Sequence, residues 1–218
     1  THVHTAQAII AAIPTALMQA AHEPYSTRAL VYMMQLHQQA EVRANQLDHL
    51  QEAADLGVYN ELEKLLEIEV QLEPAMRLPL LELCFPALRQ LSFEQYKLFS
   101  ANLDTLIRAD GRIGISEWAV RKLIDKHLGE AFEGRHSSPK YKKLELLKPQ
   151  CEILLSLLAY CDRQSGITPE QAFAAGKSEL ELDITLQDKS ELGFKKLDEA
   201  LDKLANLHPL RKPKILKA

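Results

Sequence analysis

Apolar side chains recur at steps of three and four residues along most of this 218-residue chain, and this period limits the fold more than any other feature. Such a step returns a side chain to the same face of an α-helix, whereas a strand needs a step of two. The clearest face consists of Tyr96, Phe99, Leu103 and Leu106. We therefore predict an all-α fold, an irregular multi-helix bundle whose helices each turn an apolar face toward a core.

One segment has the other period. Four apolar residues alternate with polar ones here, namely Leu180, Leu182, Ile184 and Leu186. A lone strand leaves its backbone hydrogen-bonding groups unpaired, and fewer than three strands rarely make a stable sheet. We predict an extended segment that packs on helices rather than joining a sheet.

Three capping boxes predict helix starts. In this motif two side chains, three residues apart, each accept a hydrogen bond from the other's backbone N–H. They are predicted at Asn60–Glu63, Ser92–Gln95 and Thr168–Gln171, and Pro169 suits the first helical position of the third. Further helices are predicted over residues 6–20, interrupted at Pro14, and over 24–36, 41–54, 117–128, 144–160 and 191–204.

The most apolar helix is predicted over Arg77–Leu91, which contains two prolines, Pro79 and Pro86. Proline removes a helix hydrogen bond and clashes with the carbonyl one turn earlier. We expect this helix to start at Pro79 and to kink or restart at Pro86. A helix that is apolar on nearly every side belongs at the centre of a bundle.

The polar, basic segment Gly134–Lys143 is the best candidate for a joint between parts of the chain. It separates a helical core over residues 1–134 from C-terminal helices over 144–218. A chain of this length suits one large domain or two small ones. We expect the C-terminal helices to pack on the same bundle, which gives a single compact domain rather than two.

Charge and hydrophobicity limit the partners. The formal net charge of −4 argues against nucleic acid as the main partner. The longest dense apolar stretch, Cys151–Cys161, is too short for a membrane span, which needs about 20 residues. The chain begins with Thr1 and no leader-like segment follows. We expect a soluble domain excised from a larger protein.

The cysteines are Cys84, Cys151 and Cys161, all in apolar sequence and without a C-x-x-C motif. This pattern predicts three buried thiols in a reducing compartment. The cytoplasm is the expected location.

A zinc peptidase motif begins in this chain and is not completed. The motif H-E-x-x-H places two histidines one helical turn apart on the metal, with the glutamate as base. His22 and Glu23 start it, but Ser26 occupies the second histidine position. His2 and His4 are expected to bind a metal only adventitiously. No phosphate-binding glycine loop or nucleophile motif occurs, so we predict no catalytic residue and no cofactor in this chain.

Asp110–Glu117 (DGRIGISE) matches the end of a calcium-binding loop. Calcium needs six to eight oxygen ligands, but the two earlier ligand positions hold Leu106 and Arg108. Only Asp110 and Glu117 are left as weak metal candidates, too few for calcium at cellular levels.

We predict a corner between two helices at the same place. Gly111 would adopt a left-handed conformation, which glycine tolerates best. Ile113 or Ile115 would enter the core, and Ser116 would cap the following helix.

Three stretches together resemble one known family: Ile13–Met34 (IPTALMQAAHEPYSTRALVYMM), Arg77–Ser92 (RLPLLELCFPALRQLS) and Leu106–Ile124 (LIRADGRIGISEWAVRKLI). They are similar to the cytosolic C-terminal region of bacterial membrane-embedded zinc metallopeptidases of the CAAX prenyl protease and HtpX type. The segment ADGRIGISE also resembles TerB-like tellurite-resistance domains, which are compact helical bundles.

The resemblance implies a TerB-like central part and a place at the cytoplasmic face of the bacterial inner membrane. It also implies that the membrane spans, the H-E-x-x-H motif and the zinc lie upstream of Thr1, in the parent's peptidase domain. No motif position of the peptidase lies in this chain, so no functional residue is carried over.

The leading hypothesis is a non-catalytic accessory or regulatory domain of that metalloendopeptidase. Its partner would be a protein, either its own peptidase domain or a cytosolic one. An independent helical interaction scaffold is an alternative, although no fixed-period repeat supports it. A small TerB-like metal-stress protein is another, and it depends entirely on Asp110 and Glu117.

Overall fold

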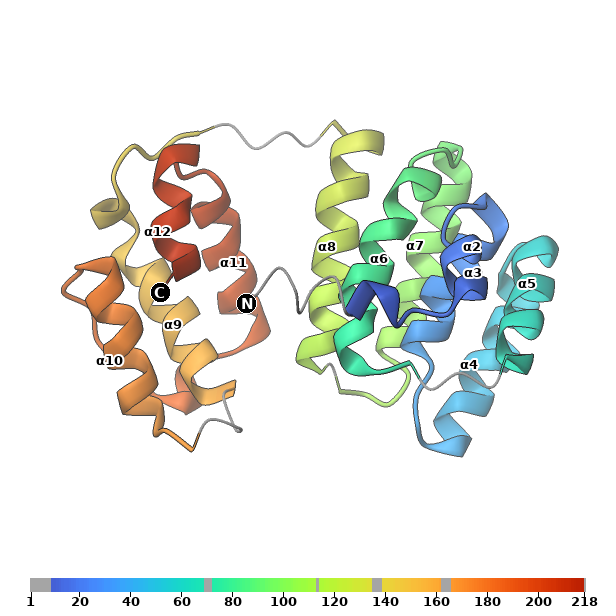
Figure 1. Cartoon of the computed structure of the whole chain (residues 1–218), viewed down its shortest axis with the longest axis horizontal. Helices are drawn as coiled ribbons and strands as arrows, with labels where there is room; N and C mark the ends of the chain where they lie inside the picture. The colour runs from blue at the N-terminus through green and yellow to red at the C-terminus, as the bar shows by residue number, and fades with distance from the viewer. Residues whose placement is uncertain (1–8, 69–71, 113, 135–138, 162–165, 218) are drawn as a thin grey trace. The chain divides into compact units, whose positions relative to one another are not determined.

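The computed structural model describes residues 9–68, 72–112, 114–134, 139–161 and 166–217. Within these ranges the regular elements are helices, and the one β-type contact is an isolated bridge between Tyr141 and Leu207. The predicted all-α, multi-helix bundle is confirmed. The chain divides into two compact units, unit 1 (Thr1–Arg135) and unit 2 (His136–Ala218). Figure 1 shows the helices of each unit in chain order.

Unit 1 is built around a central helix, α3. Its helices are α2 (Thr15–Ala20), α3 (Pro24–Gln35), α4 (Ala40–Ala53), α5 (Leu56–Glu67), α6 (Pro74–Leu88), α7 (Phe93–Ile107) and α8 (Ile115–Phe132). Helix α3 packs on α2, α5, α6 and α7, and its residues from Thr27 to Tyr32 are buried without interruption. Only a helix surrounded on all sides can bury a full turn in this way.

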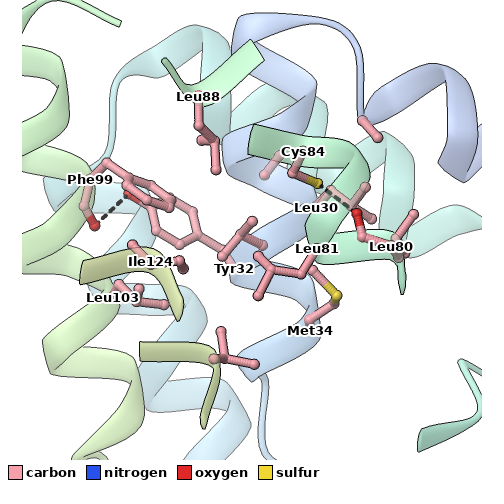
Figure 2. Packing of buried hydrophobic residues seen from close by; sticks show 14 of the residues in the cluster. Leu30, Tyr32, Met34, Leu80, Leu81, Cys84, Leu88, Phe99, Leu103 and Ile124 are labelled. Atoms are coloured by element: carbon pink, nitrogen blue, oxygen red, sulfur yellow. Dashed lines mark hydrogen bonds between the residues drawn. The ribbon is translucent and has the colours of Figure 1, made fainter. Parts of the chain in front are cut away.

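The hydrophobic core of unit 1 draws side chains from α2 to α8. Figure 2 labels members of it from α3, α6, α7 and α8. Tyr32 of α3 lies against Phe99 of α7, with ring centroids 5.5 Å apart. The Tyr32 hydroxyl donates to the Phe99 carbonyl oxygen over 3.5 Å, so the phenol is satisfied inside the core. All four residues of the predicted face are buried: Tyr96, Phe99, Leu103 and Leu106.

Helix α6 runs through both prolines, so the predicted start at Pro79 is wrong. It begins at Pro74, with Glu73 as N-cap, and continues past Pro86. Each proline lacks the N–H that would bond the carbonyl oxygen four residues earlier, which is that of Ala75 for Pro79 and that of Glu82 for Pro86. Ala75 and Glu82 are exposed, so water can take the place of the missing N–H. The remaining faces of α6 pack on α2, α3 and α8, as expected for a central helix.

Two of the three predicted capping boxes are confirmed. Ser92 opens α7 and Thr168 opens α10 (Pro169–Leu180), each accepting from the N–H three residues on. The box at Asn60 is wrong, because α5 begins at Leu56 and Asn60 lies inside it. Here the chain turns earlier, at Asp55, whose carboxylate pairs with the buried Arg28.

Unit 2 is arranged around α9. Its elements are η1 (Leu144–Leu147), α9 (Lys148–Cys161), α10, η2 (Lys189–Glu191), α11 (Phe194–Ala205), η3 (Pro209–Arg211) and α12 (Lys212–Lys217). Helix α9 packs on both α10 and α11. None of the helices in the described ranges combines the length and apolarity that crossing a membrane requires.

The predicted extended segment packs on α9, as expected. Leu182 and Ile184 belong to the core of unit 2, as does Leu180, which is the last residue of α10 and not part of the extended segment. Two α9 side chains accept the backbone N–H groups that a neighbouring strand would otherwise satisfy. Glu152 accepts from Thr185 N and Ser156 from Gln187 N, each over 2.9 Å.

The C-terminal helices have a hydrophobic cluster of their own, centred on residues such as Leu147, Leu155 and Leu204. The boundary between the two units lies within the predicted joint, Gly134–Lys143. Since each unit buries its own core, neither depends on the other for one. The packing of residues 144–218 on the first bundle stays a prediction.

The prediction of three buried thiols is wrong at one position. Cys84 and Cys151 are buried, but Cys161 is exposed. Cys151 and Cys161 are ten residues apart on α9, roughly 280° around the helix, so they cannot share its buried face.

Candidate functional site

The Asp110–Glu117 corner is a tight turn between α7 and α8. Gly111 has a φ of 73°, so the predicted left-handed conformation is confirmed. Asp110 Oδ1 accepts the backbone N–H of Arg112 over 2.9 Å, which closes the turn.

The second half of the corner differs from the prediction. Helix α8 begins at Ile115 with Gly114 as N-cap, so the predicted cap at Ser116 is wrong. Glu117 Oε2 accepts the Gly114 N–H over 2.7 Å, which is the carboxylate half of a capping box. Ile115 is 44% exposed and does not enter the core, and Ile113 lies outside the described residues.

Both metal candidates therefore serve the backbone. The second Asp110 oxygen lies 3.6 Å from His37 Nε2. Across the described part of the chain, no three His, Cys, Asp or Glu side chains come together as metal ligands. His2 and His4 lie outside it. What this corner visibly does is join two helices.

The incomplete peptidase motif lies at the start of α3. Glu23 is the N-cap of α3, and His22 is exposed in the preceding turn. Ser26, in the second histidine position, donates to Glu61 Oε2 over 2.8 Å, and Lys64 donates to Oε1 over 2.6 Å. These bonds, Lys64 first, lower the pKa of Glu61. Ser26 therefore connects α3 to α5.

The two buried thiols are poor nucleophiles. Burial raises the pKa of Cys84 and that of Cys151 to about 11. At neutral pH both remain protonated, whereas the thiolate is the reactive form. Cys84 donates to the Leu80 carbonyl oxygen over 3.2 Å within α6.

A concave feature of unit 1 lies where α3 and α5 end and α4 and α6 begin. We call it the α3–α6 hollow. It has a volume of about 700 Å³ and is open on one side, a size that suits a small ligand or a few side chains of a partner. Its apolar lining residues, which we call the floor, are Met33, Met34 and Leu36, Leu65, Leu66 and Ile68, and Leu72 and Pro74, but polar atoms make up more of its exposed surface than apolar ones.

Two arginines line the hollow, Arg43 from α4 and Arg77 from α6. Both are half-buried, and neither forms an ion pair with another described residue. The Nε of Arg77 is fully buried and makes no hydrogen bond. A buried donor without a partner costs about 1–3 kcal/mol, so native proteins rarely keep one without a use for it.

Other arginines of unit 1 also have one buried nitrogen without a partner, but their charges are paired. Arg28 pairs with Asp55 and donates from Nε to the Pro24 carbonyl oxygen over 3.1 Å. Arg121 Nε lies 2.9 Å from Asp104 Oδ1. Arg43 and Arg77 differ because their positive charge has no partner within the described ranges.

The α3–α6 hollow could not be predicted from the sequence, because its lining residues come from four helices and the segments that join them. One signal was present in Arg77, a charged residue at the start of the most apolar stretch of the chain. A lone arginine beside such a stretch needs either solvent or an anionic partner.

Comparison of the chain with protein-family models, with curated proteins and with solved structures finds no match. The geometry of unit 1 therefore carries the functional argument.

Proposed function

We propose that this chain is a non-catalytic accessory domain that binds protein through the α3–α6 hollow of unit 1. Its parent would be a membrane-anchored zinc metallopeptidase, with the domain on the cytoplasmic side. The observation that carries the binding role is the combination of partly exposed apolar side chains with two arginines that form no ion pair with any described residue.

The floor supports protein binding because some of its apolar side chains are still reachable by solvent. Met33, Leu66 and Leu72 pack against the core but stay partly exposed at the hollow. Covering such surface is favourable, and flexible methionines adapt to different partners. The four surrounding helices are anchored in one core, so they hold the floor in shape.

The peptidase part of the proposal rests on the resemblance of three stretches. Two of them contain α3 and most of α6, and the third contains the corner and the first half of α8. Helix α6 packs on both α3 and α8, so the three stretches meet in the core of unit 1. A resemblance that concentrates in one folding core is what a shared domain would produce.

The test compares the full-length protein with a form that lacks residues 1–218. Both are assayed in the same detergent on a short unstructured peptide and on a folded membrane substrate. We expect zinc content and cleavage of the short peptide to stay within a few-fold. Turnover of the folded substrate, or the abundance of the protein in the membrane, should fall much further.

A matched pair of variants assigns the effect to the hollow. Leu66→Gln removes an apolar residue of the floor, and Leu56→Gln removes an exposed leucine at the other end of α5, about 15 Å away along the helix. Only Leu66→Gln should reproduce the effect of the deletion on the folded substrate.

Three results would contradict the proposal. If the deletion abolishes cleavage of the short peptide while zinc stays bound, the domain supplies part of the active site. If no H-E-x-x-H precedes Thr1 in the full-length protein, the independent scaffold replaces the peptidase domain. If Leu66→Gln and Leu56→Gln behave alike, the hollow is not the binding surface.

A further inference from the structure

The charges around the α3–α6 hollow indicate the chemistry of its partner. Arg43 and Arg77 stand against a single acidic residue, Glu73, among the described lining residues. Glu73 is exposed and makes no hydrogen bond to the start of α6. Among the described residues, the lining therefore carries an excess of positive charge, although the whole chain has a net charge of −4.

The helix ends do not supply this charge. Helices α4 and α6 begin at the hollow and bring partial positive charge, while α3 and α5 end there and bring partial negative charge. Two starts and two ends roughly offset each other. The preference for an anion must come from the two guanidinium groups.

Guanidinium groups favour carboxylates, because their planar donors match the two carboxylate oxygens. Arg77 forms no ion pair with a described residue, and its buried Nε makes no hydrogen bond. An incoming carboxylate would neutralise its charge by accepting from the terminal guanidinium nitrogens, since the buried Nε is closed to a ligand. The apolar floor beside it requires hydrophobic side chains on the same ligand.

We infer that the α3–α6 hollow binds an acidic amphipathic segment of a partner protein, with its apolar side chains on the floor and its carboxylates on Arg43 and Arg77. This inference rests on the proposed protein-binding function and specifies the chemistry of the partner. A protein segment fits better than a fatty acid, because the hollow is open on one side. Pockets for small ligands usually enclose most of the ligand surface.

The experiment selects peptides on the full 218-residue chain from a random dodecapeptide display library. The enriched sequences should combine Asp or Glu with Leu, Ile, Met or Phe. The most enriched peptide is then labelled, and its dissociation constant is measured by fluorescence anisotropy at low and high salt. Binding should weaken as salt rises, because the arginines are partly exposed.

Four variants locate the contacts. Arg43→Gln and Arg77→Gln should each weaken binding roughly tenfold, as expected for a lost hydrogen bond to a charged group. Arg89→Gln is the matched control, since Arg89 lies at the opposite end of α6, about 18 Å from Arg77 along the helix. Leu66→Gln tests the floor. Thermal melting checks that each variant is folded. If Arg77→Gln does not fold, Arg43→Gln alone tests whether an arginine of the hollow contributes to binding.

Each outcome decides something. Enriched peptides without acidic residues, or equal binding by Arg43→Gln, Arg77→Gln and Arg89→Gln, would overturn the inference. If such peptides still lose affinity on Leu66→Gln, the proposed protein-binding function survives without its acidic partner. If no peptide is enriched, both fail. Binding of dodecanoate in place of peptides would identify a lipid occupant, and concentration-dependent dimerisation lost in Leu66→Gln would identify a second copy.

Discussion

The Asp110–Glu117 corner and the α3–α6 hollow are neighbours in unit 1, yet they treat their charged residues in opposite ways. His37 faces Asp110, while Leu36 and Gln38 on either side of it line the hollow. At the corner, each carboxylate accepts a backbone N–H and so stabilises the turn or the helix start. At the hollow, the guanidinium groups of Arg43 and Arg77 form no ion pair with a described carboxylate.

The difference teaches that a motif in sequence and a site in structure are separate things. The corner resembles a calcium loop, but folding already uses its oxygens. The hollow has no motif, and its two arginines form no ion pair with a described residue. Charge that folding does not use is the better sign of function, because keeping it costs stability unless binding offsets the cost.

The largest effect is expected where a buried arginine is already paired. Arg28 is 2% exposed and pairs with Asp55, so Arg28→Met leaves a carboxylate and the Pro24 carbonyl without their partner. We expect the free energy of unfolding to fall by about 2–3 kcal/mol. Chemical denaturation of unit 1 measures it, and Asp55→Asn, which keeps an acceptor, should cost less. If Arg28→Met lowers the free energy of unfolding by less than Asp55→Asn does, the pairing of Arg28 with Asp55 is contradicted.

The next effect concerns the backbone of the corner. Gly111→Val places a β-branched residue at a φ of 73°, which should lower the free energy of unfolding by about 1–3 kcal/mol. No neighbouring atom lies within 4 Å of a Cβ built there, so conformation alone is responsible. Gly193→Ala is the control, because Gly193 has an extended backbone with equally open surroundings. If both substitutions cost the same, the turn is not strained.

Much of the fold could be predicted from the sequence because local chemistry decides it. The capping boxes at Ser92 and Thr168, and the apolar face that includes Phe99, depend on residues within a turn or two of each other. The predictions failed where distant residues decide. Asn60 has the spacing of a cap, but the start of α5 is set by Asp55, which pairs with Arg28 on another helix.

Less of the candidate site could be predicted. The left-handed Gly111 follows from a short local pattern, and the structure contains it. The hollow forms where the ends of α3 and α5 meet the starts of α4 and α6. Nothing in the sequence indicates that Arg43 and Arg77 line the same hollow. Helix α6 starts at Pro74 rather than at the predicted Pro79, and this earlier start places Arg77 within a helix at the hollow.

A smaller effect, of opposite sign to that of Arg28→Met, is expected at the hollow. Arg77→Met removes a buried nitrogen without a partner and keeps an unbranched side chain of good helix propensity. The free energy of unfolding should stay level or rise by up to about 1 kcal/mol. The measurement is the same denaturation, run beside Arg89→Met at the other end of α6. A loss above about 1 kcal/mol would mean that Arg77 stabilises the fold, and the unused charge would no longer support binding.

Adding metal is expected to leave the stability of the chain unchanged, which is the smallest of these effects. Calcium needs six or more oxygens and zinc about four ligands, and the corner presents Asp110 and Glu117 with one oxygen of each already bonded to the backbone. Binding would have to break those bonds and so destabilise the turn that holds the ligands in place. The melting temperature of the purified chain should therefore not change with micromolar calcium, and metal analysis should find no stoichiometric zinc. Asp110→Asn keeps the oxygen that closes the turn, so it should melt within a degree or two of the parent chain with or without calcium. A calcium-induced rise in melting temperature that Asp110→Asn abolishes would turn the corner into a metal site and reverse the contrast with the hollow.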